Sequence, residues 1–434
     1  MNNEKSYKIS RYTIFTEKNE KLFLINTFSS SIIEVKKDQK EFIDKILKNS
    51  KLSYKSKKYY DYRSILISNN FMIDSSIDEL RQMELLYKAN YFNTESLRFT
   101  LLPTLKCNFS CPYCFEEGDT RYKWSSKDVK TIKLFVEKYF RNKKNISIAL
   151  FGGEPLLEWR NVQDIFNYII ELKDTYGFEM SNSIATNGFL LSEKVIEEMV
   201  LKFNFNSFQI SIDGCRRTHD ESRCLKNGNP TFSVIIKNVK KLIKVKIQSN
   251  RNIFVNIRVN LMNNTIKEVK EFLDTGFDIS ERKYINIYFR PIYNTEGFKK
   301  ENCNRDNLID FFSLARELGY KVIDDVTLKS RYLACEGDGF TKQFQIQPDM
   351  SLWKCAHDTK CEIANFGFIE EDGSMNIDYS KLEKWSRNNP FNDDKCKNCI
   401  YLPICWGGCP LNFLKTNNRS CFYEKDFNAF DLFQ

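Results

Sequence analysis

Cysteine is the residue type in this sequence with the clearest capacity for chemistry. The 434-residue chain contains 14 cysteines but only 2 histidines. Cys107, Cys111 and Cys114 lie in one short segment with C-x3-C-x2-C spacing, and eight further cysteines lie beyond residue 330. Zinc usually takes four ligands from paired C-x2-C units, and the first segment supplies only three unevenly spaced thiols. Three thiolates on a four-iron cluster leave one iron open, so this spacing favours an iron–sulfur site that binds a small molecule.

The composition excludes several other classes of protein. A net charge of +9, from 66 Lys and Arg against 57 Asp and Glu, is too small over this length to indicate nucleic-acid binding. No uninterrupted apolar stretch reaches about 18 residues, and the first residues are polar, so neither a membrane span nor a secretory signal is expected. We therefore predict a cytoplasmic protein, in which thiols stay reduced and disulfides are rare.

Three domains are expected to position the cysteines, over residues 1–95, 96–320 and 321–434. The first domain has the pattern of a small winged-helix-like module, with strands followed by helices. The third is loop-rich and dense in cysteine, so bound clusters are expected to substitute for an apolar core there. The elements predicted in these two domains are strands over 12–16, 22–26 and 32–35, helices over 40–48, 65–71 and 77–89, and a hairpin over 343–346 and 352–354.

The second domain alternates strands with helices. This alternation predicts parallel strands with helices outside, in an α/β fold that forms a partial (β/α)6 barrel. The strands are predicted over residues 97–105, 146–151, 180–186, 207–212, 253–259 and 284–289. The helices are predicted over residues 127–140, 162–176, 193–203, 233–242 and 267–274.

Unusual residues follow four of these strands. Cys107 comes after the first strand, Gly152-Gly153-Glu154 after the second, Thr186-Asn187 at the end of the third and Ser211 to Asp213 at the end of the fourth. In a barrel of parallel strands, ligands bind at the carboxyl ends of the strands. The four groups are therefore expected to meet on one rim of the barrel as a binding site.

Cys107, Cys111 and Cys114 resemble the signature of the radical S-adenosylmethionine (SAM) superfamily. The resemblance implies that the three thiolates hold a [4Fe-4S] cluster whose open iron binds the amino and carboxylate groups of SAM. One electron from the cluster then cleaves SAM to methionine and a 5′-deoxyadenosyl radical, which removes a hydrogen atom from an unactivated C–H bond. Structural zinc or buried free thiols remain the alternative for these cysteines.

Gly152, Gly153 and Glu154 are similar to the GGE motif of that family, which holds the SAM ammonium group. Glycines permit close approach of the backbone, and a carboxylate is a charge-assisted acceptor. Thr186 and Asn187 are expected to contribute to the same SAM site, although Asn187 precedes a glycine and is also typical of a plain turn.

The remaining SAM contacts are also implied by the resemblance. Ser211 and Asp213 resemble the residues that contact the ribose, and Arg223 resembles the arginine that pairs with the SAM carboxylate. Tyr113 is expected to face the adenine through its backbone. A turn for Ser211 and a surface ion pair for Arg223 are the simpler alternatives.

The C-terminal cysteines resemble the SPASM extension of peptide-modifying radical SAM enzymes, in which seven cysteines serve two auxiliary [4Fe-4S] clusters. The resemblance implies three clusters in all. The second auxiliary cluster would use Cys396, Cys399, Cys405 and Cys421, and the first would use Cys335, Cys355 and Cys409. Zinc sites are the alternative, because Cys396-x2-Cys399 is also half of a zinc knuckle.

The sequence departs from the SPASM pattern around the first auxiliary cluster. Met350 occupies a position that is usually glycine, and Thr341 lies where an eighth cysteine is usually found. Either Cys361 completes this cluster, or one iron stays open for a substrate thiolate. Three cysteines match no motif and are expected to be buried as small hydrophobic residues, namely Cys215, Cys224 and Cys303.

Residues 1–95 resemble the peptide-recognition element of maturases that act on ribosomally made peptides. Such an element adds a leader peptide as a strand to an exposed sheet edge. The hairpin over residues 12–26, with Leu22, Leu24 and Asn26 on one face of its second strand, would suit that module; a generic N-terminal cap on the barrel is the alternative. We therefore predict an enzyme that cross-links a precursor peptide, through a thioether from cysteine sulfur to carbon, with flavodoxin or ferredoxin as electron donor. Carbon–carbon cross-linking, anaerobic sulfatase maturation to formylglycine and an iron–sulfur redox sensor are the alternatives. The sequence names no catalytic acid or base.

Overall fold

The protein is described by a computed structural model. It describes residues 6–18, 20–48, 56–114, 124–262, 264–292, 305–323, 339, 343–355, 362–419 and 421. The chain divides into two compact units. The barrel unit comprises residues 94–323 and 341–382, and the terminal unit comprises residues 1–93, 324–340 and 383–434. The terminal unit thus combines residues from both ends of the chain, and the barrel unit combines residues 94–323 with the later segment 341–382.

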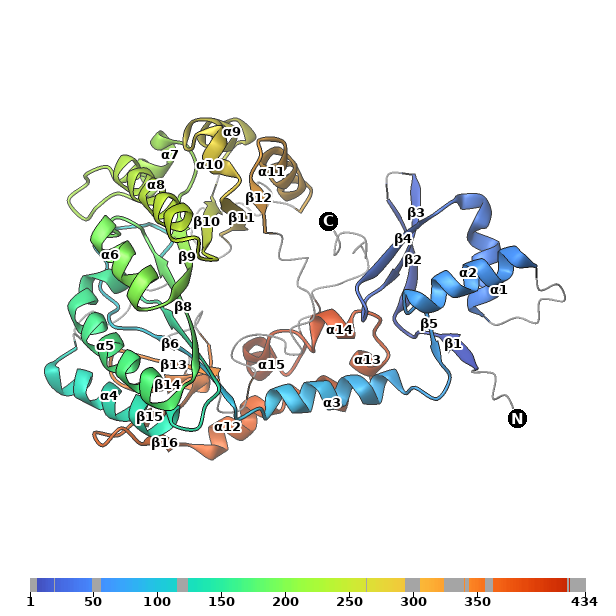
Figure 1. Cartoon of the computed structure of the whole chain (residues 1–434), viewed down its shortest axis with the longest axis horizontal. Helices are drawn as coiled ribbons and strands as arrows, with labels where there is room; N and C mark the ends of the chain where they lie inside the picture. The colour runs from blue at the N-terminus through green and yellow to red at the C-terminus, as the bar shows by residue number, and fades with distance from the viewer. Residues whose placement is uncertain are drawn as a thin grey trace. The chain divides into compact units, whose positions relative to one another are not determined.

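The barrel unit contains the predicted parallel strands in sequential order, with helices on their outer side (Figure 1). The partial (β/α)6 barrel is thereby confirmed. The strands are β6 (Ser96–Leu101), β7 (Asn145–Leu150), β8 (Glu179–Thr186), β9 (Phe205–Ser211), β10 (Phe254–Leu261) and β11 (Ile285–Pro291), with the short β12 (Lys321–Val322) beyond them. The helices are α4 (Ser126–Phe140), α5 (Trp159–Tyr176), α6 (Glu193–Glu197), α7 (Arg216–Ser222), α8 (Phe232–Ser249), α9 (Ile266–Thr275), α10 (Ile279–Arg282) and α11 (Arg305–Glu317).

The strands alternate between an apolar outer face and a polar inner face. Phe99 of β6 contacts Phe135 of α4, and Phe289 of β11 contacts Phe311 of α11, so this set of positions faces the helices. The intervening residues, such as Arg258 of β10, face the concave side of the sheet and are only partly buried. Because the inner face is polar, the concave side of this barrel suits a polar ligand rather than a packed core.

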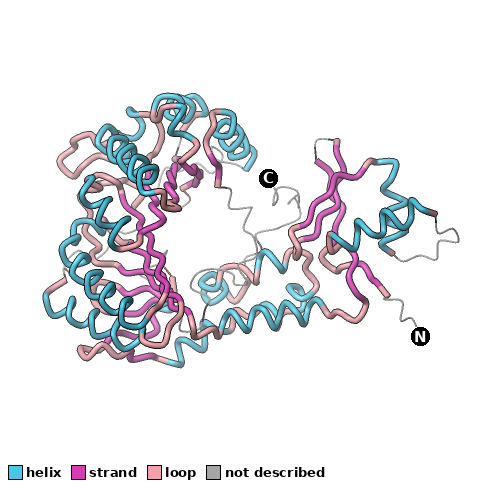
Figure 2. Tube along the Cα trace, viewed as in Figure 1, coloured by secondary structure: helices cyan, strands magenta, loops and turns pink. Residues whose placement is uncertain are grey.

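A second group of strands continues the sheet beyond β6 (Figure 2). The predicted hairpin is confirmed, and its first strand pairs in parallel with β6. Met350, in the hairpin turn, has φ +68°, a backbone region that favours glycine, which explains why glycine is usual at this position. The added strands are β13 (Gln343–Ile346), β14 (Ser351–Trp353), β15 (Asn365–Ile369) and β16 (Met375–Ile377), followed by α12 (Tyr379–Ser386).

The N-terminal part of the terminal unit contains the predicted hairpin with its third strand, in the order β2-β3-β4. The helix predicted over 65–71 is wrong in its bounds, because the helix begins at Lys57 after the Ser56 cap and residues 72–74 form a strand. The elements are β1 (Tyr7–Ile9), β2 (Thr13–Lys18), β3 (Lys21–Asn26), β4 (Ser31–Val35), α1 (Lys40–Leu47), α2 (Lys57–Ser68), β5 (Met72–Asp74) and α3 (Glu79–Tyr91).

The second strand of the hairpin, which was expected to suit peptide binding, is itself not available to a peptide. Leu22 and Leu24 lie in the core formed with α1 and α2, and Asn26 is 1% exposed. Strand β3 is also the central strand of its sheet and pairs on both sides. The free edges of this three-stranded sheet are therefore β2 and β4.

The C-terminal part of the terminal unit has short helices that contain or adjoin cysteines. They are α13 (Asp394–Lys397), α14 (Leu402–Cys405) and α15 (Pro410–Thr416). Within the ranges that the structure describes, no helix is both long and apolar enough to cross a bilayer.

Candidate functional site

The turn after β7 packs directly against the segment that leads to Cys107. The backbone N–H of Gly153 donates to the carbonyl of Thr104 at 3.1 Å, and that of Glu154 donates to the carbonyl of Lys106 at 2.8 Å. A Cβ atom added to Gly153 would lie 2.3 Å from the Lys106 oxygen, which is far inside van der Waals contact. The glycine therefore permits the close approach that fixes the cysteine-bearing loop.

Glu154 is fully buried and connects the ends of three strands. Its carboxylate accepts hydrogen bonds from the Thr186 hydroxyl at 2.8 Å, from the Asn187 backbone N–H at 2.8 Å and from the Leu156 backbone N–H at 3.0 Å. Burial raises the pKa of Glu154, and these hydrogen bonds oppose that rise. The structure thus brings Glu154, Thr186 and Asn187 together as predicted.

Asn187 continues this set of contacts to the cysteine loop. Its amide nitrogen donates to the Asn108 side-chain oxygen at 2.8 Å and lies 3.8 Å from the Cys107 sulfur. The Cys107 sulfur also accepts from the Phe109 backbone N–H at 3.4 Å. Donors aimed at a sulfur stabilise its thiolate form, which is the form that ligates iron.

The three cysteines of the loop form a half-buried group at the rim. The pKa of the Cys111 thiol is raised to about 12, mainly by burial, with contributions from Cys107 and Cys114 and with Arg223 acting in the opposite direction. Within the described part of the chain, no three Cys, His, Asp or Glu side chains are gathered closely enough to hold a single metal ion. A cubane cluster binds each thiolate to a different iron and so spaces its ligands more widely than one ion does. Three adjacent thiols with sulfur-directed donors fit such a cluster.

A second polar group lies at the ends of β9 and β10. The Tyr113 hydroxyl donates to the Asp213 carboxylate and accepts a hydrogen bond from Arg223 at 2.7 Å. Asn260, at 4% exposure, donates to Asp213 at 3.0 Å and to Tyr113 at 3.2 Å. The loop cysteines and the predicted ribose and carboxylate contacts are thereby joined in one network. Ser211 lies at the end of β9, two residues before Asp213.

Arg223 is the buried cation of this network. Its side chain is 8% exposed and its guanidinium lies 4.0 Å from the Asp213 carboxylate, so the surface ion pair considered above is wrong. The Nε atom is buried and has no hydrogen-bond partner in the structure. A buried guanidinium donor without an acceptor fits a ligand that brings a carboxylate.

His219, one of the two histidines, is hydrogen-bonded to the backbone of this network. The Nδ1 atom of His219 accepts the backbone N–H of Asp213 at 3.2 Å, and Nε2 lies 3.1 Å from the Thr231 hydroxyl, which in turn donates to the Arg223 carbonyl. Burial lowers the pKa of His219 well below its ordinary value, so the ring is neutral. These contacts place His219 as a support for the loop between Asp213 and Arg223.

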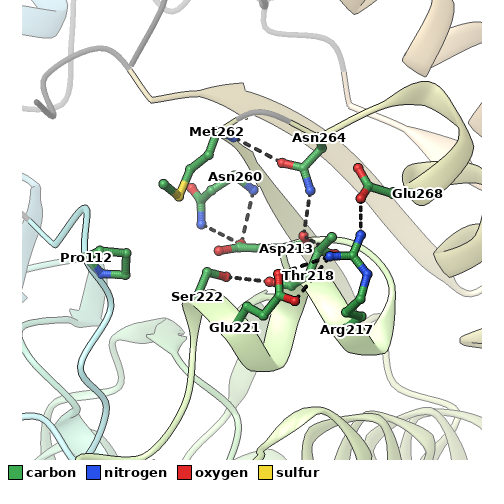
Figure 3. Close-up of a pocket in the computed structure, with 10 residues that line it drawn as sticks. All are labelled: Pro112, Asp213, Arg217, Thr218, Glu221, Ser222, Asn260, Met262, Asn264 and Glu268. Atoms are coloured by element: carbon green, nitrogen blue, oxygen red, sulfur yellow. Dashed lines mark hydrogen bonds and ion pairs between the residues drawn. The ribbon is translucent and has the colours of Figure 1, made fainter. Parts of the chain in front are cut away.

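A pocket of about 300 Å³ opens beside Asp213 and Asn260 (Figure 3). Its wall includes Pro112 of the cysteine loop, and its far side carries Arg217, which donates to Glu221 at 3.2 Å and also to Glu268. Sequence reasoning missed Asn260, because it is one of several polar residues that alternate with apolar ones along β10. The other lining residues are Thr218, Ser222, Met262 and Asn264.

Cys399 and Cys405 of the terminal unit each lie within electrostatic reach of Cys396 and of Cys421, and of each other. Neighbouring Cys399 and Cys405 help to raise the pKa of Cys396, which burial brings to about 12, and Cys399 and Cys421 help to raise that of Cys405 to about 11. Arg419 fixes the surrounding loops, since it donates to Asp393 at 2.9 Å. These are the four cysteines predicted for the second auxiliary cluster, and their mutual proximity fits that donor set.

The other cysteines are less informative. Cys409 caps the N-terminus of α15, where its sulfur accepts from Asn412 at 3.5 Å, and Cys355 lies after β14 in the barrel unit. Cys215 is buried as predicted, but Cys224 is only partly buried, so that prediction is wrong for it. The predictions for Cys303, Cys335 and Cys361 lie outside the described residues.

Comparisons with known proteins agree on one domain. Residues 101–276 match the model of the Radical SAM superfamily. The chain is 26% identical over 364 residues to the cysteine-type anaerobic sulfatase-maturating enzyme of Clostridium novyi, covering 77% of this chain and 94% of that enzyme. It is 24% identical over 366 residues to the radical SAM cyclopropyl synthase TigE of Paramaledivibacter caminithermalis, covering 77% and 71%. The chain also shares its fold with the solved structure of native anSMEcpe with bound AdoMet and Cp18Cys peptide, with a TM-score of 0.52. The two sequences are 22% identical, and the match covers 72% of this chain and 89% of that chain.

Proposed function

Because residues 101–276 form a radical SAM domain, we propose that this enzyme is a peptide maturase that joins a cysteine sulfur to a carbon atom of a precursor peptide. The domain implies SAM and one [4Fe-4S] cluster as cofactors, which together supply a carbon radical that abstracts a hydrogen atom. The observation that carries the proposal is the convergence of Cys107, Glu154 and the Asp213–Arg223 pair on one rim. A relative named as a sulfatase-maturating enzyme and a solved structure of the same fold with a bound peptide support the substrate class.

Within the rim, we assign each residue by what its contacts allow. Cys107, Cys111 and Cys114 hold the cluster, and Asn187 orients the loop that carries them. Arg223, with its unused Nε donor, binds the SAM carboxylate. Ser211 and Asp213 remain the proposed ribose contacts. The carboxylate oxygens of Glu154 accept hydrogen bonds from Thr186, Asn187 and Leu156. Glu154, with Gly152 and Gly153, therefore fixes the backbone conformation around the SAM ammonium group.

The concave face of the barrel is the proposed place for the reacting peptide residue. Arg258 of β10 donates to Asn260 at 2.7 Å, and Arg290 of β11 lies over the ring of Tyr288 at 5.8 Å. Burial raises the pKa of Tyr288, so its phenol stays neutral. The two arginines give this side of the barrel a positive character that suits a peptide segment with an acidic residue.

We propose that the terminal unit carries an auxiliary [4Fe-4S] cluster on Cys396, Cys399, Cys405 and Cys421. Their mutual proximity supports this ligand set. The first auxiliary cluster remains a proposal from the sequence, with Cys335, Cys355 and Cys409 as ligands and either Cys361 or an open iron in the fourth position. A one-electron donor of the flavodoxin or ferredoxin kind and a cytoplasmic location complete the proposal.

Mass spectrometry of the product decides between the candidate functions. Anaerobically reconstituted enzyme with dithionite, SAM and the precursor peptide is expected to form 5′-deoxyadenosine and a peptide that has lost two hydrogen atoms and one alkylatable thiol. A cross-link that leaves every thiol alkylatable would instead establish carbon–carbon coupling. Formation of formylglycine from a sulfatase peptide would establish sulfatase maturation, the second candidate, which is favoured by the 94% coverage of the Clostridium novyi enzyme. Absence of 5′-deoxyadenosine would overturn all three.

Strand β4 is the proposed edge for the leader peptide. It pairs only with β3 among the described strands, and Ile32 on this edge is 36% exposed. We expect Ile32→Lys to weaken leader binding about tenfold, because an apolar contact is replaced by a charge on the docking edge. Fluorescence anisotropy with a labelled leader peptide measures the effect.

A matched variant separates this effect from general damage to the module. Ile65 on α2 is 46% exposed and lies away from the sheet edge, so Ile65→Lys is expected to leave leader affinity unchanged. If the Ile32→Lys variant and the wild type bind the leader peptide with equal affinity, β4 is not the docking strand. The proposal that the enzyme cleaves SAM would not be affected by that result.

A further inference from the structure

The segment Cys396-Lys397-Asn398-Cys399-Ile400 is held by side chains from the other end of the chain. Arg11 donates from Nη2 to the Lys397 carbonyl at 2.6 Å. Thr27, which is 2% exposed, donates from its hydroxyl to the Ile400 carbonyl at 2.5 Å. One carbonyl lies between the two cysteines and the other lies directly after them. The N-terminal module therefore restrains both ends of a C-x2-C segment that lies nearly 400 residues away in the sequence.

A buried polar network fixes the residues that make these contacts. The Glu79 carboxylate accepts from the Ser10 hydroxyl at 2.6 Å and from the Arg11 backbone N–H at 2.8 Å. The Asn26 amide donates to Ser10 at 2.8 Å, and the Thr27 backbone N–H donates to the Tyr12 carbonyl at 3.0 Å. Glu79 lies in the first turn of α3, and Asn26 lies at the end of β3. The backbone at Arg11 is therefore held by both a helix and a sheet.

An apolar core continues across the same boundary. Tyr12 and Tyr87 of the N-terminal module share a core with Leu402 and Trp406, and the Tyr87 and Trp406 rings stack at 6.2 Å. Cys396 packs against this core. The N-terminal module thus packs directly against the cysteine segment.

The hydroxyl group of Tyr12, in this shared core, is a hydrogen-bond donor without an acceptor. Its side chain is 0% exposed, and its hydroxyl has no hydrogen-bond partner in the structure. Burial and the nearby Cys399 both act to raise its pKa, so the phenol keeps its proton. A buried O–H group without an acceptor is destabilising, and an acceptor at this position would remove that cost. The sulfur atoms of an iron–sulfur cluster are such acceptors.

We infer that Arg11, Tyr12 and Thr27 are positioning residues for the auxiliary cluster on Cys396, Cys399, Cys405 and Cys421, and that Tyr12 donates a hydrogen bond to a sulfur of that cluster. The inference rests on the proposed function only in that these four cysteines bind a cluster. It gives the N-terminal module a second task besides leader binding, which is to complete the cluster site and set its reduction potential.

The Tyr12→Phe variant tests the hydrogen bond, because it removes the hydroxyl and keeps the ring. Wild-type protein is expected to hold about twelve irons per chain, and the variant the same number, since no ligand is lost. In a redox titration followed by EPR, the midpoint potential of one auxiliary cluster should become more negative. The expected change is about tenfold in the reduction equilibrium constant, which corresponds to about 59 mV for a one-electron couple. Tyr60→Phe, at a half-exposed tyrosine of the same module, is the control and should not move it.

The Arg11→Ala/Thr27→Val double variant tests the restraint on the segment. We expect the iron content to fall by up to about four per chain, while 5′-deoxyadenosine formation without peptide is retained in the barrel unit. Arg63→Ala, at an arginine stacked over Tyr7 in the same module, is the matched control. Thermal melting shows whether the module stays folded, and Arg11→Lys, which keeps a donor, should recover part of the iron.

The outcomes separate this inference from the proposed function. About four irons in the wild type would remove the auxiliary clusters themselves. About twelve irons in the wild type and in every variant, with unchanged potentials, would overturn the positioning role while leaving the clusters in place.

Discussion

Replacement of Gly153 by alanine is expected to reduce 5′-deoxyadenosine formation at least about 100-fold, since displacements of about 1 Å at a reacting centre can cost that much. The added Cβ would lie 2.3 Å from the Lys106 oxygen and 2.4 Å from the Leu105 oxygen, and both obstacles are backbone atoms that cannot rotate away. The loop that carries Cys107 would have to shift. Iron analysis should show the loss of about four irons, those of the SAM-binding cluster.

Gly228→Ala is the control for this effect. Gly228 has φ +81°, and no atom lies within 4 Å of the position that a Cβ would take, so alanine there adds backbone strain of about 1 kcal/mol without a steric clash. Near-normal iron content and activity are expected for it. If Gly153→Ala retains both the cluster and the activity, the close approach of the two loops is not required.

Replacement of Arg223 by glutamine is expected to raise the dissociation constant for SAM at least about 100-fold, because a buried charge-assisted contact to a carboxylate is lost. The change also leaves the Asp213 carboxylate buried beside a neutral side chain, which typically costs about 3–5 kcal/mol of folding stability. Equilibrium dialysis with SAM and a thermal melt measure the two effects. Arg216→Gln, at an exposed arginine in the first turn of α7, the helix that ends just before Arg223, should change neither.

A double variant distinguishes binding from folding. Asp213→Asn with Arg223→Gln removes both members of the buried ion pair, so most of the lost stability should return. SAM affinity should not return, because no cation remains for its carboxylate. Full recovery of SAM binding in the double variant would show that Arg223 only balances the charge of Asp213.

The candidate site was predictable to the extent that it depends on local sequence. The C-x3-C-x2-C spacing and the polar residues after each strand identified the rim, because parallel strands must bring their carboxyl ends together. Asn260 and His219 were missed, since a single polar residue gives no periodic signal. Their roles depend on contacts with Asp213, 47 and 6 residues away in the sequence.

The errors have a common physical origin in long-range pairing. The alternation of Leu22, Leu24 and Asn26 correctly placed them on one face, but periodicity does not tell which face is covered. The third strand made β3 central and turned that face toward α1 and α2. In the same way, nothing local indicated that Thr27 would contact Ile400, and hence that the two ends of the chain share one compact unit.

The pairing of β13 with β6 has a consequence for the solubility of the chain. Without β13, the six-residue β6 would be the open edge of the sheet, and an apolar open edge is a template for intermolecular strand pairing and aggregation. The added strands move that edge to β16, which is only three residues long and offers few free backbone groups to another molecule. Strands β13 to β16 therefore shield the strand that leads into the cysteine loop from pairing with a second copy of the chain.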